Sequence, residues 1–247
     1  MTDPRSKLIV ALDVSTYEEA RVIVETLGDA VEIYKVGFQQ FVAYGPFIVR
    51  YLQAQGKKVF LDLKFHDIPN TVASGVTSAV GLSVAPHDAG TGKFAPLLML
   101  TVHTQGGVEM MKAAAEAAKK RAAELNVPRP LIVGVTVLTS DAATDETPKL
   151  VLARARMAKE SGLDGVVASV QEAAMLRKEC GKDFVIVTPG IRMADGAAGD
   201  QKRVDTPGGA IKNGSSFLVV GRPIVKAQDP RQAALDILAD MRRALTS

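Results

Sequence analysis

Two charged side chains at alternate positions mark the segment with the clearest chemistry. Asp62 and Lys64 directly follow the apolar run Val59-Phe60-Leu61 and are separated by a single leucine. Residues two apart on a β-strand face the same side, so a strand here would point both charges the same way. Charged groups among buried neighbours must be paired or take part in chemistry, because burying an isolated charge is very costly. The pair therefore predicts either a catalytic ammonium beside a carboxylate or an interior salt bridge that fixes strand register.

Further charges lie at the ends of other apolar runs. Asp13 and Lys35 each lie at or near the carboxyl end of such a run, and Asp67 follows Lys64 by three residues. Together with Asp62 they would form a network of alternating carboxylates and ammonium groups in which the lysines stay protonated. A network of this size favours catalysis over a single register-fixing salt bridge.

A second group of residues has the chemistry of phosphate binding. The segments are Thr188-Pro-Gly-Ile-Arg192 and Val219-Val-Gly221-Arg222. Glycine permits close approach of the backbone to a ligand, and arginine offers a charged fork for an anion. The small, glycine-rich stretch 193–201 is typical of a mobile lid. The alternatives are a helix-start turn with a solvated arginine and an ordinary flexible loop.

The elements that must position these groups alternate regularly along the chain. Short apolar runs, most of them continuous as expected for strands covered on both faces, are separated by amphipathic helical stretches. We expect strands at residues 8–13, 31–37, 59–64, 97–103, 131–139, 165–169, 184–188 and 217–221. Eight strand–helix units in 247 residues predict an α/β fold, a (β/α)8 TIM barrel in one domain spanning residues 1–247. A doubly wound open sheet is the alternative.

Local signals predict where several helices begin and end. Ser15-x-x-Glu18 and Ser169-x-x-Glu172 have the spacing of capping boxes, and Gly28 is a suitable C-terminal stop. Asp229-Pro230 predicts the start of the last helix. One connection is irregular, because Gly81–Pro96 has the glycine and proline density of a surface loop.

Composition excludes several classes of protein. A net charge of +3 with scattered basic residues argues against nucleic-acid binding, and no apolar run approaches the length of a membrane span. The single cysteine, Cys180, cannot form an internal disulfide or a cysteine metal cluster. The histidines, His66, His87 and His103, lack metal-ligand spacing, so we expect no metal site. These features predict a cytoplasmic protein.

The residues named above, taken together and in order, resemble the bacterial orotidine 5'-phosphate decarboxylase family. The resemblance covers nearly the whole chain, and its most specific part is the Asp-x-Lys-x-x-Asp motif continued by Ile-Pro-Asn-Thr. The matching segments are Leu12-Asp13, Tyr34-Lys35-Val-Gly37, Asp62-x-Lys64-x-x-Asp67-Ile-Pro-Asn-Thr71, Val135-Thr-Val-Leu-Thr139-Ser140, Thr188-Pro-Gly-Ile-Arg192, Gly199-Asp-Gln201 and Gly221-Arg222-Pro223. The long Gly81–Pro96 segment and Thr104-Gln105 depart from the family pattern.

The resemblance implies decarboxylation of orotidine 5'-monophosphate to uridine 5'-monophosphate, the last step of UMP synthesis, without a cofactor. It implies a homodimer whose active sites are shared across the interface. The implied catalytic residues are Lys64 as the proton donor, with Asp62, Asp67 and Lys35. The implied substrate-binding residues are Asp13, Lys35, Asp62, Thr71, Thr139, Arg192, Gln201, Gly221 and Arg222.

Two other functions remain as alternatives. Related barrels that act on sugar phosphates share the Asp-x-Lys-x-x-Asp motif but use magnesium and carry an extra acidic residue near it, whereas Phe60 stands two positions before Asp62 here. A phosphate-binding barrel that serves only as a ligand sensor is the other alternative. The intact charged motif argues against it, since a simple binder does not need buried charges of such cost.

Overall fold

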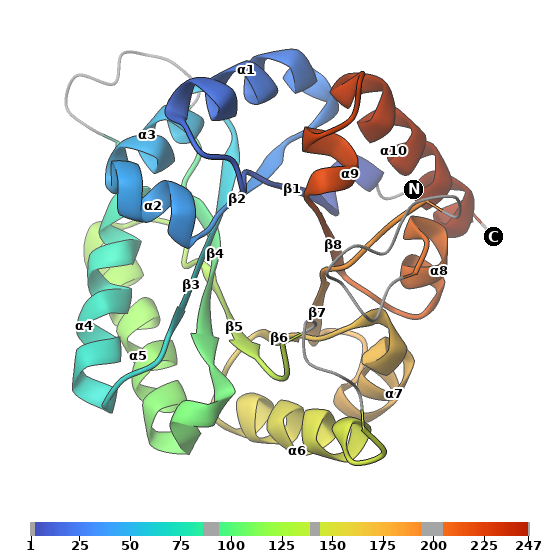
Figure 1. Cartoon of the computed structure of the whole chain (residues 1–247). Coiled ribbons are helices and arrows are strands. Elements are labelled where there is room, and N and C mark those ends of the chain that lie inside the picture. Colours follow the sequence, from blue (N-terminus) through green and yellow to red (C-terminus); the bar gives the residue numbers. More distant parts are fainter. Residues whose placement is uncertain (1–2, 86–93, 139–143, 194–204, 247) are drawn as a thin grey trace.

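Eight parallel strands close into a barrel in which each strand pairs with the next along the chain and β8 pairs with β1 (Figure 1). The computed structural model describes residues 3–85, 94–138, 144–193 and 205–246. The strands are β1 Leu8–Ala11, β2 Ile33–Val36, β3 Lys58–Phe65, β4 Leu97–His103, β5 Leu131–Val135, β6 Gly165–Val167, β7 Val185–Thr188 and β8 Phe217–Val220. Closure confirms the predicted (β/α)8 barrel and rejects the open doubly wound sheet.

Helices surround the barrel and cover the outer face of every strand (Figure 1). They are α1 Tyr17–Leu27, α2 Phe38–Tyr44, α3 Pro46–Ala54, α4 Pro69–Val80, α5 Gly107–Leu125, α6 Thr147–Glu160, α7 Val170–Cys180, α8 Pro207–Lys212, α9 Arg222–Val225 and α10 Pro230–Thr246. Short 3-10 turns lie at Pro4–Ser6, Gly28–Ala30, Gly81–Ser83 and Thr104–Gly106. No described helix combines the length and apolar character that a bilayer crossing demands.

Two hydrophobic cores explain why the strands are apolar on both faces. A large core fills the space between the strands and the helices and includes Leu8, Tyr34 and Leu100. A smaller core fills the barrel interior with inward-facing side chains, such as Ile33, Phe60 and others from neighbouring strands. Alternate residues of one strand thus enter different cores, so a continuous apolar run is required.

The helix-start predictions need two corrections, and the first is at α1. The α1 capping box is formed by Thr16 and Glu19, one residue later than predicted, with the Glu19 backbone N–H donating to the Thr16 hydroxyl at 3.1 Å. Both pairs have the capping spacing, and the local sequence alone does not decide which register the chain adopts. Gly28 ends α1 as predicted, with a positive φ of 49°.

The other helix ends are closer to expectation. Ser169 is the N-cap of α7, but its hydroxyl donates to the Glu172 carboxylate instead of capping the backbone, so the second predicted box is not formed. Asp229 caps α10 as predicted, accepting the Gln232 backbone N–H at 2.9 Å. The predicted loop 81–96 begins with a 3-10 turn, and its residues 86–93 lie outside the described part of the chain.

Candidate active site

A cavity of about 430 Å³ opens at the carboxyl ends of the strands, directly above the inner core. The alternation of β-strands accounts for its chemistry. On β2 the inward position after Ile33 is Lys35, and on β3 the inward position after Phe60 is Asp62. Asp13 occupies the corresponding place beyond β1. The strand pattern that packs the core therefore also brings the charged residues to one wall of the cavity.

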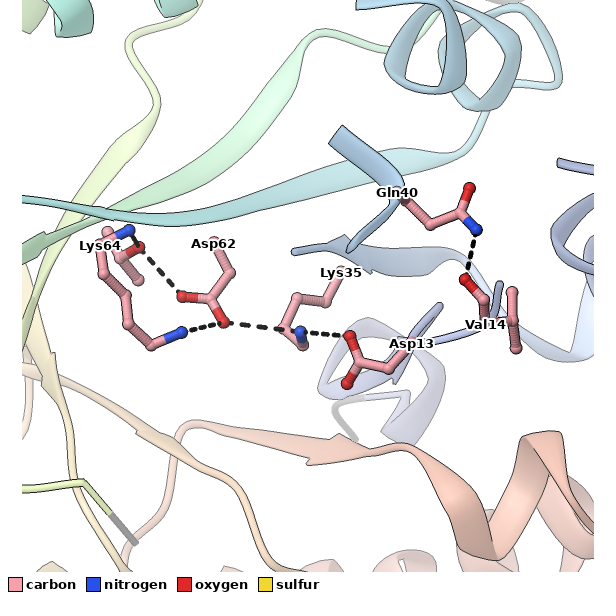
Figure 2. A network of polar contacts seen from close by, with 7 residues as sticks. Asp13, Val14, Lys35, Gln40, Asp62 and Lys64 are labelled. Carbon is pink, nitrogen blue, oxygen red and sulfur yellow. Dashed lines mark hydrogen bonds and ion pairs between the residues drawn. The ribbon is translucent and has the colours of Figure 1, made fainter. Parts of the chain in front are cut away.

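Four of these charges form a continuous chain of ion pairs (Figure 2). The Lys35 ammonium lies 3.0 Å from an Asp13 oxygen and 3.5 Å from Asp62 Oδ2. The Lys64 ammonium lies 2.9 Å from the same Asp62 oxygen. Negative and positive groups alternate from Asp13 to Lys64, so the chain is neutral as a whole. The structure thus brings together four of the predicted site residues.

Burial and mutual attraction act in opposite directions on the central pair. Lys35 and Asp62 are only 9% and 8% exposed. Burial raises the pKa of Asp62, but the nearby ammonium groups of Lys35 and Lys64 outweigh it and hold the pKa below its usual range. Burial likewise lowers the pKa of Lys35, and the carboxylates of Asp62 and Asp13 reverse that effect and raise it. Both groups therefore stay ionised at neutral pH.

Gly37 provides room for this network. A β-carbon at this position would stand 3.0 Å from the Lys35 nitrogen and 3.4 Å from an Asp13 oxygen. Any larger residue would push the ion pair apart, which gives a physical reason for glycine in the Lys35-Val-Gly37 sequence.

Lys64 has an unusual backbone conformation. Its φ is 44°, in the left-handed region, which among the described non-glycine residues only Asn126 shares. Such a conformation costs on the order of 1–3 kcal/mol and persists only where surrounding contacts hold it in place. Asp62 and Lys64 both line the cavity, in keeping with the prediction that they point the same way, although β3 is irregular here and does not follow simple strand alternation.

The part of the cavity wall that adjoins β1 on its other side is formed by the ends of β7 and β8. It includes Gly190, Arg192, Gly221 and Arg222, which are the residues predicted to bind phosphate. The Arg192 backbone N–H donates to the Asp205 carbonyl at 3.0 Å, which ties this loop to the segment before α8. Burial, followed by the nearby Arg222 charge, lowers the pKa of Arg192. Guanidinium groups are well suited to hold a phosphate, because they donate charged hydrogen bonds to its oxygens.

Two predicted residues do not line this cavity, and two others lie outside the described part of the chain. Asp67 is exposed, and its carboxylate accepts the Ile68 backbone N–H at 2.6 Å. Thr71 is also exposed, in the first turn of α4. Thr139 and Gln201 lie outside the described residues, as does most of the glycine-rich stretch 193–201.

Three further residues support the site without having been predicted. Thr101 on β4 is fully buried, and its hydroxyl donates to Asp62 Oδ1 at 3.0 Å. Gln40 is also buried and donates to the Val14 carbonyl at 2.6 Å, which holds the loop after β1 against α2 (Figure 2). The Phe38 ring lies 5.6 Å from the Lys64 nitrogen, within cation–π range. The sequence offered one sign of Thr101, because it is a polar residue inside an apolar run. No sequence pattern pointed to Gln40 or Phe38.

The remaining reactive side chains lie apart from the ion-pair chain. His66 and His103 stack with ring centroids 5.4 Å apart, and Cys180 is buried at the end of α7. Within the described ranges, no group of three or more histidine, cysteine or acidic side chains has a geometry that could hold a metal ion.

Comparisons with known proteins agree on one family. The sequence model of the orotidine 5'-phosphate decarboxylase / HUMPS family matches residues 6–237. Orotidine 5'-phosphate decarboxylase of Syntrophus aciditrophicus is 46% identical over 253 aligned residues, covering 98% of this chain and 95% of the relative. The enzyme of the same name from Moorella thermoacetica is 44% identical, covering 96% and 92% of the two chains.

Solved structures give the same result. The crystal structure of orotidine 5'-phosphate decarboxylase from Lactobacillus acidophilus superimposes with a TM-score of 0.76 at 36% identity, covering 95% of this chain and 98% of the other. The enzyme from Pyrococcus horikoshii OT3 superimposes with a TM-score of 0.72 at 26% identity, covering 95% and 99%.

Proposed function

The chain belongs to the orotidine 5'-phosphate decarboxylase / HUMPS family, and we propose that Lys64 is the proton donor of its reaction. The enzyme is a carboxy-lyase that converts orotidine 5'-monophosphate to uridine 5'-monophosphate and carbon dioxide, the last step of de novo UMP synthesis. The observation that carries the assignment of Lys64 is the ion-pair chain, which holds its ammonium beside Asp62 at the cavity wall.

The chemistry requires a charge of this kind. When the bond between C6 and the carboxylate breaks, its electron pair stays on C6 in the plane of the ring and cannot delocalise into the π system. The Lys64 ammonium stabilises that pair and then transfers a proton to C6, while carbon dioxide leaves with no change in oxidation state of the protein. A fixed charge in a site that excludes water is worth more than the same charge in solution. Solvent then returns a proton to the neutral amine.

Asp62 has a second role in this proposal. Its carboxylate stands where the substrate carboxylate approaches C6, so repulsion between the two raises the energy of the bound substrate relative to the transition state. One ammonium group cannot supply a barrier reduction that reaches roughly 23 kcal/mol in enzymes. Binding energy from the distant phosphate must therefore contribute by holding the base against the charged wall.

The remaining predicted residues bind the rest of the nucleotide. We assign Asp13 and Lys35 to the ribose hydroxyls, and Thr139 to the pyrimidine edge. The phosphate is assigned to the β7–β8 wall, namely Arg192, Gly221 and Arg222, together with Gln201. Support comes from two parts of the cavity wall, one carrying alternating charges and the other two arginines.

A magnesium-dependent sugar-phosphate reaction is less compatible with these contacts. Both Asp62 oxygens are already engaged, Oδ1 by the Thr101 hydroxyl and Oδ2 by the two lysines. A divalent ion that ligated Oδ2 would compete with the two ammonium groups for that oxygen. The uncharged Phe60 beside the network supplies no further ligand.

One assay separates the proposed reaction from its alternatives. We expect the chelator-treated protein to consume orotidine 5'-monophosphate, followed as loss of the orotate absorbance, at the same rate with and without added magnesium. Activity that returns only with magnesium would favour the sugar-phosphate reaction. Binding of the nucleotide without turnover would favour the ligand sensor.

We further propose that the protein, a single domain over residues 1–247, acts in the cytoplasm as a homodimer with shared active sites. Asp67 and Thr71 are exposed and are not among the residues that line the cavity of their own chain, as we expect of residues that serve a partner's site. Large apolar side chains are exposed nearby, with Phe38 56%, Val42 82% and Ile68 66% accessible. Phe38 lies beside Lys64, so a second copy that covered this surface would also reach the active site.

Mixing two inactive variants tests this arrangement. Lys64→Ala and Asp67→Ala homodimers should each be nearly inactive. In a mixed dimer one site carries both defects, while the other combines native Lys64 with native Asp67 from the partner. Random exchange makes half of the dimers mixed, so activity should approach about a quarter of wild type. With subunit exchange shown by tagged chains, no gain over the parent variants would place Asp67 in its own subunit's site.

A further inference from the structure

An irregular pairing between β3 and β4 lies at the centre of the charged wall. Leu61 pairs with Leu100 and Phe65 pairs with Val102, so three residues of β3 lie opposite the single residue Thr101. The extra residues form a bulge, which bends a strand and redirects its side chains. Asp62 and Lys64 both belong to this bulge, which explains how the two come to face one residue of the neighbouring strand.

The Thr101 hydroxyl makes a hydrogen bond to each of them. It donates its one proton to Asp62 Oδ1 at 3.0 Å and accepts the Lys64 backbone N–H at 2.7 Å. A hydroxyl has one donor and two acceptor positions, so the donation to Asp62 fixes its rotation. Thr101 is 0% exposed, and water therefore does not compete for either contact.

These two hydrogen bonds hold the Lys64 backbone conformation and the orientation of the Asp62 carboxylate, and the proposed reaction needs both. The bond to the Lys64 N–H holds the backbone at its left-handed φ of 44°, the conformation from which the side chain reaches Asp62. The bond to Oδ1 holds the other Asp62 oxygen, Oδ2, between the ammonium groups of Lys64 and Lys35. Without the hydroxyl, the carboxylate could rotate and the bulge could relax.

We propose that Thr101 is a positioning residue, whose single hydroxyl aligns the Lys64 proton donor with the Asp62 carboxylate. The proposal rests on the functions proposed above for Lys64 and Asp62. Thr101 itself is not assigned a contact with substrate; it acts through the two residues that it holds.

A neighbouring threonine provides a matched control. Thr104 is also fully buried, and its hydroxyl donates to the Val135 backbone carbonyl at 2.8 Å. It lies three residues beyond Thr101, in the turn after β4, and its bond involves no ionised group. Replacing either threonine with valine removes one buried hydroxyl with almost no change in shape, so the two variants differ mainly in what the hydroxyl holds.

The experiment compares Thr101→Val, Thr101→Ser and Thr104→Val for turnover of orotidine 5'-monophosphate and for binding of uridine 5'-monophosphate. We expect Thr101→Val to lower kcat roughly 10- to 100-fold, the range for loss of a hydrogen bond to a charged group, with product affinity changed less than about threefold. Thr101→Ser, which keeps the hydroxyl, should restore most of kcat. Thr104→Val should lose thermal stability but keep kcat.

A spectroscopic readout separates positioning from general destabilisation. Removing a donor to the Asp62 carboxylate should raise its pKa, measured from the carboxyl carbon resonance, in Thr101→Val and not in Thr101→Ser or Thr104→Val. Should the valine variant fail to fold, Thr101→Cys takes its place, because a thiol is a much weaker donor of similar size. In Thr101→Cys we again expect a lower kcat and a higher Asp62 pKa.

Several results would overturn the proposal. They are an unchanged kcat and Asp62 pKa in Thr101→Val, an equal loss of kcat in Thr104→Val, or a serine variant as impaired as the valine variant. Failure of the proposed function looks different: wild-type protein would then not decarboxylate orotidine 5'-monophosphate at all, while the Asp62 titration would still test the role of Thr101.

Discussion

The two walls of the cavity differ in how their charges are balanced. On the β1–β3 wall, carboxylates and ammonium groups alternate, and Lys35 lies between Asp13 and Asp62 at 3.0 and 3.5 Å. On the β7–β8 wall, burial, followed by the nearby charge on Arg222, lowers the pKa of Arg192. The first wall is a chain of ion pairs, and the second carries two arginines, one of whose charges acts on the other.

This difference indicates how the work of the reaction is divided. A neutral, mutually supported network is already organised before substrate arrives, so none of the substrate's binding energy is needed to assemble it. The second wall offers two arginines, whose guanidinium groups are suited to donate charged hydrogen bonds to a dianion, so we expect this wall to supply affinity. The comparison predicts that changes on the first wall lower turnover, and that changes on the second weaken binding.

The largest effect is expected at the end of the charged network. Lys64→Met removes the proton donor and leaves Asp62 facing an apolar side chain, so kcat should fall by at least about 10⁴-fold. The affinity for uridine 5'-monophosphate, measured by calorimetry, should change far less. Lys58→Met is the control, because Lys58 is an exposed residue of the same strand. A matching loss of product affinity in Lys64→Met would contradict the division between the walls.

A smaller effect of the opposite kind is expected on the phosphate wall. Arg222→Ala should raise KM for orotidine 5'-monophosphate roughly 10- to 100-fold, because a charged phosphate contact is lost. Phosphite dianion should partly rescue the reaction of the truncated nucleoside in wild type and less so in the variant. Lys212→Ala, an exposed cation outside the cavity, serves as the control. Equal weakening of phosphorylated and unphosphorylated ligands would remove Arg222 from the phosphate site.

The smallest effect is expected at His103, the last residue of β4, and concerns the pH dependence of folding stability. Burial, then the charges of His66, Arg154 and Lys64, lower the pKa of His103. The folded-state pKa lies below the unfolded value of about 6.5, so the unfolded chain binds the proton more readily. The contribution of neutral His103 to folding stability is therefore fully present above about pH 6.5. It is lost as the pH falls through the folded-state pKa. His103→Phe, which can still stack on His66, should therefore flatten the dependence of unfolding free energy on pH between about 5 and 7.

Denaturant unfolding at a series of pH values measures that change. His66→Phe is the companion variant, because it removes one positive charge facing His103 and should move the His103 titration, followed by proton NMR, to higher pH. An unchanged titration of His103 in this variant would show that the stacked ring does not contribute to the shift.

Local patterns in the sequence determined a large part of the fold. Continuous apolar runs identified all eight strands, because each strand must pack against the interior core on one face and the helices on the other. Exact ends were less predictable. The α1 cap is formed by Thr16 instead of Ser15, and the sequence alone did not separate the two because overlapping segments carry the same capping spacing.

The site was likewise predictable in part from local patterns in the sequence. Residue types and strand ends were enough to predict that Asp13, Lys35, Asp62 and Lys64 meet, because parallel strands place their carboxyl ends at one edge. Only the tertiary structure placed Thr101 opposite the bulge and turned Asp67 out of its own chain's cavity. Strand pairing between distant segments and the backbone conformation of a single residue are set by long-range contacts, and no local spacing in a sequence records them.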